Sequence, residues 1–377
     1  MSEKPTQMHR RRRATDEATG PVAEVTPSMD TLLEYVVKMG ASDLLVAAGV
    51  APTIRVNGEL MTIPQAPILS CEMAEYLVQS MMSLEQWEEF QREWELDFSF
   101  GRRGLGRYRV GAFRERGDAS AVLRRVPAEA TPLEDLGLPK SVGSFAWLNQ
   151  GLVLVTGPSG SGKSTTLTAI IDKINHDRNV HVITIEDPIE FVHAHDRAIV
   201  QQRELGRDTT SFARALRSAL REDPDVLLIG EMRDADSISA TVSAAETGAL
   251  VFATLHTNSA AQSIDRIVDS FPPHQQTQIR FQLASSLAGI VSQRLIPTIK
   301  GGRVCVAEVL IANGGVRNLI REGKVHQIDN VMQAGIKEGM VIFDMRLAEL
   351  VRTRIIAREV ALSYAMDPHS FESRLRA

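Results

Sequence analysis

The residues from Gly157 to Ser164 constrain the fold more than any other feature of the chain. They read Gly-Pro-Ser-Gly-Ser-Gly-Lys-Ser, the complete pattern G-x-x-x-x-G-K-[ST], and the hydrophobic run Leu152–Val155 directly precedes them. Apolar residues then recur at helical spacing, at Leu167, Ile170, Ile171 and Ile174. A glycine-rich loop alone could bind nothing, but a strand, this loop and a helix in this order predict a nucleoside triphosphate site.

The residue types of the loop match the chemistry of phosphate binding. Glycines let backbone N–H groups close around phosphates, Lys163 supplies a positive charge, and Ser164 offers a hydroxyl to Mg²⁺. The following helix adds its positive N-terminal end. We therefore predict ATP and Mg²⁺ as cofactors. The predicted nucleotide contacts are Gly157, Ser159, Gly160, Ser161, Gly162, Lys163, Ser164 and Thr165.

Length and composition limit the classes of protein that the chain can represent. Its 377 residues, 44% of them hydrophobic, predict two compact domains and a tail. A formal net charge of -5 disfavours a protein coated in positive charge for duplex DNA. The sequence contains no long apolar run, so we expect a soluble, cytoplasmic protein. Cys71 and Cys305 are the only cysteines, too few for a four-cysteine zinc site.

The chain divides by composition into four segments. Residues 1–28 contain the run Arg10–Arg13 and predict a disordered tail. Residues 29–130 predict a small α+β domain, residues 131–150 a linker, and residues 151–377 an α/β ATPase domain with a helical C-terminal part.

Hydrophobic patterns predict the elements of both domains. In the first they indicate a helix ending near Gly40, a hairpin at Thr53–Val56 and Leu60–Ile63, helices between Glu72 and Glu93, and strands at Leu96–Phe100, Arg107–Phe113 and Ala121–Val126. In the second they indicate buried parallel strands at Leu152–Thr156, His181–Ile185, Val226–Ile229 and Leu250–Thr254, with helices between them. From Pro273 onward the pattern is mostly helical, with an edge hairpin around Leu295–Leu310. The second domain therefore reads as a doubly wound sheet with the phosphate-binding loop at the end of its first strand.

Acidic residues follow two of the predicted strands. Glu231 comes after Val226–Ile229, where it can activate the attacking water; a helix-starting acid is the simpler alternative. Glu186 and Asp187 leave the strand His181–Ile185 at the same sheet edge, where they can reach a metal or water. For Glu190, a surface acid and a supporting role at this site are equally good interpretations.

His256 follows the strand Leu250–Thr254. At that edge a histidine can sense the terminal phosphate, whereas a lone histidine elsewhere more often serves as a structural hydrogen-bonding group. We favour the functional interpretation.

Arginines lie on one face of a predicted strand in the first domain. Arg107 and Arg109 are two residues apart, and Arg124 lies on the next predicted strand. A guanidinium can bind phosphate oxygens across a subunit or domain boundary. A solvated basic face is the simpler interpretation of this pattern.

The four phosphate-site segments together resemble those of a known family. Gly157–Thr165, Ile183–Phe191, Leu228–Asp234 and Thr254–Ser259 look like the Walker A motif, Asp box, Walker B motif and His box of the secretion ATPases, the superfamily of GspE and VirB11. Within it the chain resembles type IV pilus retraction, or twitching motility, ATPases of the PilT and PilU type. Gly106–Val110 and Arg317–His326 share in that resemblance, which extends from about Met29 to the C-terminal region.

The resemblance implies a hexameric ring of subunits. A PAS-like N-terminal domain would abut the RecA-like domain of the next subunit, with ATP at the junction. Glu231 becomes the catalytic glutamate, Glu186 an acid near Mg²⁺ and water, and His256 the His-box residue. Arg107, Arg109 and Arg124 become phosphate contacts. The ring would turn an inner-membrane platform protein at the pilus base and extract pilin subunits.

Two departures bear on the type of motor. Assembly ATPases of this superfamily usually carry a four-cysteine zinc element, which this chain cannot form, so retraction is favoured. The segment after Gly335 and the C-terminal tail look closer to the PilU type, which implies an accessory ring subunit with a sister retraction ATPase as its partner. A nucleic-acid translocase is a third hypothesis, supported only by sheet architecture and local arginines. A small-molecule kinase is weaker still, because no acceptor-binding pattern is visible.

Overall fold

The computed structural model describes residues 27–127 and 130–376 of the chain. The predicted tail with its run Arg10–Arg13 therefore lies, except for residues 27 and 28, outside the described residues. The described residues separate into two compact units, unit 1 up to Arg125 and unit 2 from Val126 onward. Within the described residues, none of the helices has the length and apolar character needed to cross a bilayer.

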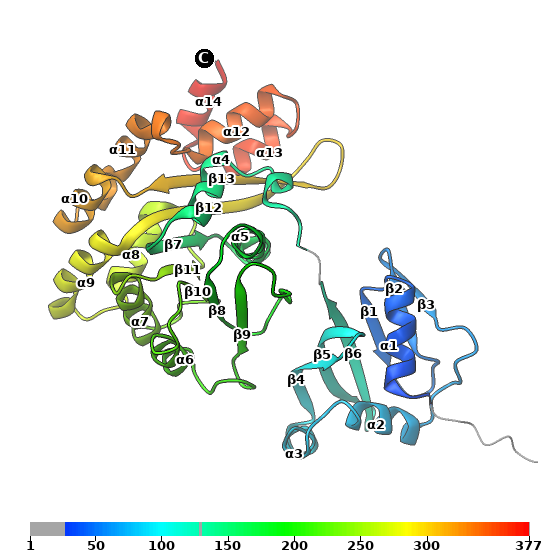
Figure 1. Cartoon of the computed structure of the whole chain (residues 1–377). Coiled ribbons are helices and arrows are strands. Elements are labelled where there is room, and N and C mark those ends of the chain that lie inside the picture. Colours follow the sequence, from blue (N-terminus) through cyan, green and yellow to red (C-terminus); the bar gives the residue numbers. More distant parts are fainter. Residues whose placement is uncertain (1–26, 128–129, 377) are drawn as a thin grey trace, which may run out of the picture. The chain divides into compact units, whose positions relative to one another are not determined.

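Unit 1 is an antiparallel sheet covered by helices (Figure 1). Its elements are α1 (Met29–Lys38), β1 (Asp43–Val46), β2 (Thr53–Val56), β3 (Glu59–Thr62), α2 (Cys71–Gln79), α3 (Leu84–Glu93), β4 (Glu95–Arg102), β5 (Gly106–Glu115) and β6 (Asp118–Val126). The strand order is β3-β2-β1-β6-β5-β4. Apolar residues of all three helices and of the sheet form one buried cluster. This is the α+β arrangement that the sequence predicts.

Local sequence explains where these elements begin and turn. Ser28, Ser70 and Ser83 cap the three helices by accepting a hydrogen bond from a backbone N–H of the first turn. Between β2 and β3, Asn57 and Gly58 have φ angles of 51° and 89°, which a two-residue hairpin turn requires. The predicted hairpin is therefore confirmed.

Unit 2 alternates strands with helices and ends in a helical region. Its elements are η1 (Leu133–Leu136), α4 (Lys140–Ser144), η2 (Phe145–Trp147), β7 (Gly151–Thr156), α5 (Lys163–Asp177), β8 (His181–Glu186), β9 (Ile199–Glu204), α6 (Phe212–Ala219), β10 (Val226–Ile229), α7 (Ala235–Glu246), β11 (Leu250–Leu255), α8 (Ala260–Asp269), α9 (Pro273–Ser286), β12 (Leu287–Pro297), β13 (Arg303–Ile311), α10 (Gly314–Glu322), η3 (Val325–Gln327), α11 (Ile328–Ala334), η4 (Gly335–Glu338), α12 (Phe343–Arg352), α13 (Arg358–Tyr364) and α14 (Pro368–Arg376).

The sheet of unit 2 has the order β13-β12-β7-β11-β10-β8-β9, with only β13 antiparallel to its neighbour. Successive residues of β7 point to opposite faces. Leu152 and Leu154 join the buried cluster under α6 to α10, whereas Val153 and Val155 join the cluster under α5. Helices therefore cover both faces, and the predicted doubly wound α/β core is confirmed (Figure 1).

Two features of this sheet differ from the sequence prediction. The strand β9 was not expected, because its residues, Ile-Val-Gln-Gln-Arg-Glu, are mostly polar, which is tolerated at the sheet edge that it occupies. The hairpin predicted around Leu295–Leu310 begins earlier, at Leu287, and its first strand pairs with β7 inside the sheet. Residues 287–291, Leu-Ala-Gly-Ile-Val, hid that boundary, because a short apolar run fits a buried helix or a strand equally well.

The segment 131–150, expected as a linker, packs onto unit 2. Leu133, Val142 and Phe145 are buried in the cluster that also contains Leu167 and Ile170 of α5. The lack of a side chain at Gly289 of β12 explains part of this fit, because a Cβ there would overlap the ring of Phe145. The exact domain boundaries stay a prediction.

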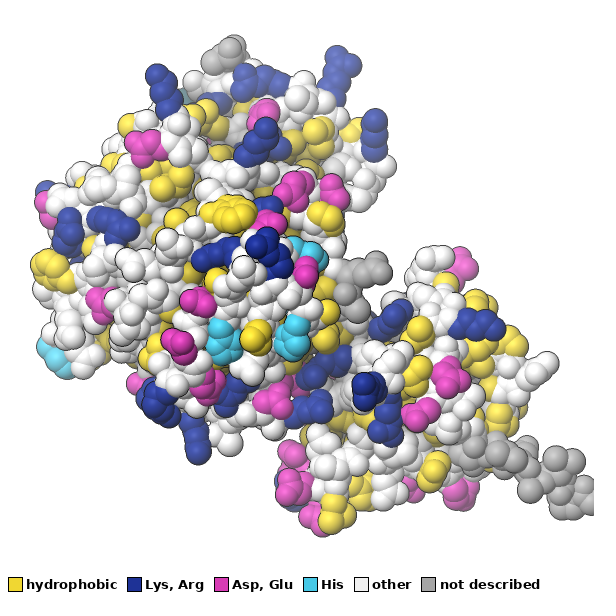
Figure 2. Space-filling view, viewed as in Figure 1, with side chains coloured by type: hydrophobic (Ala, Val, Ile, Leu, Met, Phe, Trp, Pro, Cys, Tyr) yellow, Lys and Arg dark blue, Asp and Glu magenta, His cyan; other side chains and the backbone are white. Residues whose placement is uncertain are grey.

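The surface of unit 2 mixes charges of both signs. On the face seen in Figure 2, Lys and Arg side chains are interspersed with Asp and Glu side chains. This matches the modest net charge of -5 for the whole chain.

Candidate active site

A cavity of about 300 Å³ opens at the carboxyl ends of the parallel strands in unit 2. Ligands of open α/β sheets bind at this edge. The cavity is bordered by the phosphate-binding loop on one side and by the ends of β8, β10 and β11 on the other. Among the predicted site residues, its lining contains Ser159, Gly160, Lys163, Ser164, Glu186, Glu231 and His256.

The backbone of the loop depends on glycine at its first position. Gly157 has a φ angle of 145°, and a Cβ there would overlap the backbone oxygen of Gln293 and lie 2.6 Å from the hydroxyl of Ser161. Gly162, in a left-handed conformation with φ of 89°, then starts α5 at Lys163. The loop is therefore held against β12 before any ligand contact is made.

Lys163 is the first residue of α5, and its side-chain ammonium group points into the loop. Its Nζ donates to the backbone oxygens of Gly157, at 2.9 Å, and Pro158, at 3.2 Å. Burial lowers the pKa of Lys163, and the carboxylates of Glu231 and Glu190 oppose that change.

These features fit a nucleotide phosphate. Ser159, Gly160, Lys163 and Ser164 of the loop line the cavity, and within the described part of the chain the buried hydroxyl of Ser161 in the same loop has no hydrogen-bond partner. The N-terminal end of α5 faces the same space. Lys163 could exchange its two carbonyl contacts for phosphate oxygens, which are stronger acceptors for an ammonium group.

Glu231 occupies the centre of the acidic edge. Its carboxylate accepts a hydrogen bond from Nε of Arg233 at 2.8 Å and lies 3.3 Å from Nε2 of His256. Arg233 also lies 3.2 Å from the carboxylate of Asp187. A hydrogen bond from the hydroxyl of Thr254 to the backbone oxygen of Gly230 ties β11 to the end of β10. Glu231 and His256 are therefore neighbours in space, although they are 25 positions apart in the sequence.

Glu186 is held by two polar side chains. The hydroxyl of Thr184 donates to its Oε1 at 2.6 Å, and Nε2 of Gln202 does so at 3.2 Å. Burial raises the pKa of Glu186 above its ordinary value, while these hydrogen bonds favour the ionised form. A carboxyl with a raised pKa is a better proton acceptor near neutral pH.

Gln202 of β9 also anchors the segment that follows Glu186. Its Nε2 donates to the backbone oxygen of Phe191 at 2.7 Å, and its Oε1 accepts from the backbone N–H of His193 at 2.9 Å. Burial lowers the pKa of His193 to about 4, so this ring is neutral at neutral pH. No local signal predicts the role of Gln202, because nothing in this polar edge strand distinguishes it from its neighbour Gln201.

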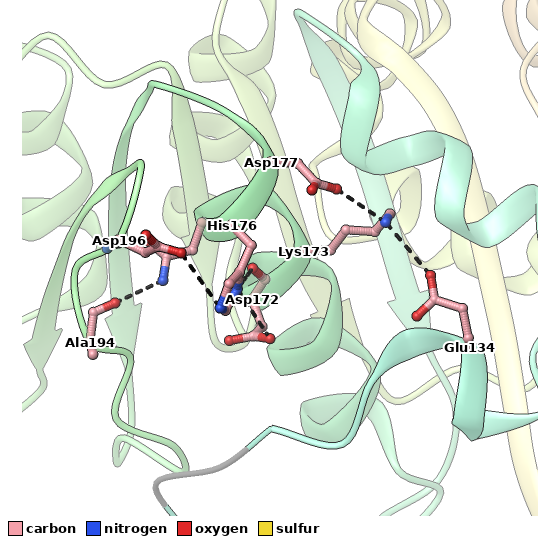
Figure 3. A network of polar contacts seen from close by, with 8 residues as sticks. Glu134, Asp172, Lys173, His176, Asp177, Ala194 and Asp196 are labelled. Carbon is pink, nitrogen blue, oxygen red and sulfur yellow. Dashed lines mark hydrogen bonds and ion pairs between the residues drawn. The ribbon is translucent and has the colours of Figure 1, made fainter.

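A polar network connects the C-terminal end of α5 to the segment 187–198, which lies between β8 and β9 (Figure 3). Asn175 donates to the backbone oxygen of Ala194 at 2.7 Å, and the ring of His176 lies between Asp172, at 3.5 Å, and Asp196, at 3.6 Å. A hydrogen bond to the backbone of Asp172, with these carboxylates, raises the pKa of His176. Because α5 starts at the phosphate-binding loop and the segment follows Glu186, the network joins the supports of both.

On the opposite side of α5, Lys173 connects the helix to η1. Its Nζ lies 3.1 Å from the carboxylate of Asp177 and 3.6 Å from that of Glu134 (Figure 3). The segment before β7 is thereby attached to the helix that carries the phosphate-binding loop.

The arginines predicted as phosphate contacts lie in unit 1. Arg107 and Arg109 share one face of β5, while Tyr108 and Val110 between and after them are buried on the other. Nε of Arg124 donates to the carboxylate of Asp43 at 2.9 Å. The predicted alternation is confirmed, and the role of these arginines at the phosphates stays a prediction.

The hairpin β12–β13 contributes two buried residues that sequence analysis did not single out. Gln293 of β12 contacts the phosphate-binding loop, and Glu308 of β13 accepts a hydrogen bond at 2.7 Å from the backbone N–H of Ala260, the first residue of α8. The segment from His256 to Ser259 directly precedes that helix. The available sequence signal for Gln293 and Glu308 was that each is a polar residue in a largely apolar strand pattern.

Glu308 should make stability depend on pH. Burial, with Asp329 and Asp344 adding to it, raises the pKa of Glu308 to about 7, against the opposing effects of the Ala260 N–H and Arg294. The folded state then keeps a proton that the unfolded state loses, so stability should fall as pH rises from about 4.5 to about 7. Glu308→Gln keeps the hydrogen-bond acceptor but cannot ionise. At pH 8 its free energy of unfolding should therefore be larger than that of wild type by about 2 to 3 kcal/mol.

Urea unfolding at pH 5 and pH 8 measures this difference, with the exposed Glu359→Gln as the control. An equal pH dependence in wild type and Glu308→Gln would contradict it.

Comparison with known proteins gives consistent matches. The family model described as "Type II/IV secretion system protein" matches residues 18–358. The type IV pilus retraction ATPase PilT of Pseudomonas aeruginosa is 47% identical over 340 residues, which cover 90% of this chain and 98% of that protein. The type IV pilus ATPase PilU of the same organism is 41% identical over 337 residues, 89% of this chain and 88% of that protein.

A solved structure agrees with these matches. The crystal structure of the pilus retraction motor PilT with bound ADP superimposes with a TM-score of 0.84 at 44% identity, covering 92% of this chain and 99% of that one.

Proposed function

The chain belongs to the type II/IV secretion system protein family and is an ATPase of the type IV pilus retraction type, and we propose that it works as a hexameric, Mg²⁺-dependent ring motor. ATP hydrolysis would change the angle between its two domains and so power pilus retraction and twitching motility. One observation carries this proposal: Lys163, Ser164, Glu186 and Glu231 line a single cavity at the end of a RecA-like sheet.

Each of these residues has a task in the proposed reaction. The loop amides and Lys163 bind and orient the phosphates, because positioning and charge neutralisation supply most of the catalysis of phosphoryl transfer. Glu231 orients the attacking water and accepts its proton. His256, 3.3 Å from Glu231, fixes that carboxylate and connects it to the end of β11.

The donor set also fits Mg²⁺. Ser164 at the start of α5 would supply a hydroxyl ligand, and Glu186 would contact the ion through water. Among residues 27–127 and 130–376, no group of three or more Asp, Glu, His or Cys side chains could hold a metal by itself. Mg²⁺ keeps several waters and binds beside substrate phosphates, so a site of this kind requires no such group. When bound, the ion neutralises charge that develops on the phosphates.

The proposed ring needs groups from a neighbouring domain. Arg107, Arg109 and Arg124 would contact the phosphates from an N-terminal domain, and a contact made only before hydrolysis would favour one domain angle over another. The proposed partners are further copies of this chain and a platform protein at the inner membrane. We place the ring in the cytoplasm, at the pilus base.

An accessory role is the second candidate. The match to PilU supports it, although the identity to PilT is higher, 47% against 41%. In that case the ring would assist a sister retraction ATPase. The two roles differ in what happens when this chain alone loses hydrolysis.

Lys163→Ala tests both candidates in cells. Loss of the ammonium group should abolish hydrolysis by the purified protein, and pili should extend but no longer shorten if the ring is the primary motor. Microscopy of labelled pili measures shortening. Retraction at the wild-type rate in this strain, with the variant present at normal levels, would contradict the primary role and support the accessory one.

A further inference from the structure

Gln293 of β12 is buried beneath the phosphate-binding loop, with 1% of its surface exposed. Its Nε2 donates to the backbone oxygen of Ser161 at 2.8 Å, and its Oε1 accepts from the hydroxyl of Thr166 at 2.9 Å. Its own backbone oxygen occupies the space that a side chain at Gly157 would need. One residue therefore contacts the loop at its start and middle and the first turn of α5.

These contacts pair both ends of the side-chain amide of Gln293. An amide supplies a donor and an acceptor from one planar group, and here the donor faces the loop while the acceptor faces the helix. A buried polar group is costly unless it is paired, so this pairing favours one loop conformation over others.

The next residue along the strand faces the other way. The guanidinium of Arg294 lies 5.4 Å from the centre of the Phe343 ring, and its Nη1 approaches the backbone oxygen of Tyr364 at 3.5 Å. Phe343 begins α12 and Tyr364 ends α13, so β12 lies between the phosphate-binding loop and the C-terminal helices. The hairpin β12–β13 thus connects the two regions through adjacent side chains.

We propose that Gln293 is a positioning residue for nucleotide binding, which holds the phosphate-binding loop open in the conformation that accepts phosphate. This rests on the proposed function of the same site. The residue touches no substrate; it acts through Ser161 and Thr166. A loop that is not held must lose conformational freedom when nucleotide binds, and this loss weakens affinity.

Replacement by leucine tests the proposal. Gln293→Leu keeps the approximate volume and removes both hydrogen bonds, so we expect the Kd for a fluorescent ADP analogue to rise about tenfold, or about 1.4 kcal/mol. The matched control is Ile296→Ala on the same strand, whose buried side chain packs against the C-terminal helices. That variant should lose stability but keep its ADP affinity within about twofold.

A second variant separates positioning from general stability. In Gln293→Glu, a protonated carboxyl can still donate to Ser161 and accept from Thr166, whereas an ionised one faces the Ser161 oxygen without a proton. ADP affinity of this variant should therefore be close to that of wild type at low pH and fall at high pH more steeply than that of wild type or Gln293→Leu. This pH profile is not expected of a side chain that only fills space.

The outcomes are distinct from those of the proposed function. If wild-type protein binds ADP and Gln293→Leu binds it within twofold of wild type, the positioning role is wrong and the ATPase function stands. If Gln293→Leu does not fold, the Gln293→Glu profile decides, and a profile parallel to that of wild type overturns the proposal. If wild type itself binds no nucleotide, the proposed function fails.

Discussion

Glu231→Gln is expected to lower the rate of ATP hydrolysis by about 10² to 10⁴-fold while ATP affinity stays within about threefold of wild type. The amide keeps the size of the carboxylate and can keep the contact to Arg233, but it cannot accept a proton from water. The substitution leaves the proposed phosphate contacts of Lys163 and the loop amides unchanged, so their contribution to affinity should remain. Single-turnover hydrolysis and equilibrium nucleotide binding, measured on the same preparation, separate the two effects.

Glu190→Gln is the matched control for this experiment. It removes the same charge from the lining of the same cavity, without a place at the end of β10. Its hydrolysis should stay within about tenfold of wild type, since charge alone changes the site less than loss of the proton acceptor. Equal losses in both variants would assign the effect to cavity charge and remove Glu231 from the proposed role.

Gly157→Ala is expected to destroy nucleotide binding, with an affinity lower by about 100-fold or more and a stability lower by about 2 to 4 kcal/mol. Alanine is strained at a φ angle of 145°, and its methyl group would overlap the backbone oxygen of Gln293. That oxygen belongs to an interior strand of the sheet and cannot move without disturbing β7. The loop would move instead and carry the backbone N–H groups out of register with the phosphates.

Gly160→Ala is the control in the same loop. Gly160 also has a positive φ angle, 73°, but no atom lies within 4 Å of the Cβ that alanine would add. The backbone strain alone should cost about 1 kcal/mol, with ADP affinity reduced less than tenfold. Calorimetry and ADP titration of both variants measure these quantities. Similar behaviour of the two would show that contact with β12 does not constrain the loop.

Local pattern predicted much of the fold because the relevant physics acts over a few residues. The residues of β7, β8, β10 and β11 by themselves predicted buried strands. The motif Gly157–Ser164 predicted the loop between a strand and a helix. The strand β9 and the start of β12 were harder. The first is polar because it lies at an edge, and the second begins with a short apolar run, residues 287–291, that fits either kind of element.

The sequence by itself determined which chemistry the chain can perform. A lysine and a hydroxyl at fixed positions in a glycine loop predict phosphate binding, and acids after two strands predict water activation at the edge where those strands end. Such motifs are short and continuous, so they predict this chemistry without any knowledge of contacts elsewhere in the chain.

Only the tertiary structure decided which residues support that chemistry. Gln293 donates to Ser161, 132 residues earlier, and Gln202 donates to Glu186, 16 residues earlier. Glu308 accepts from Ala260, 48 residues earlier. A buried amide or carboxyl acquires its role from the partner that the fold presents, since its hydrogen bonds and its pKa depend on surroundings that no local pattern contains.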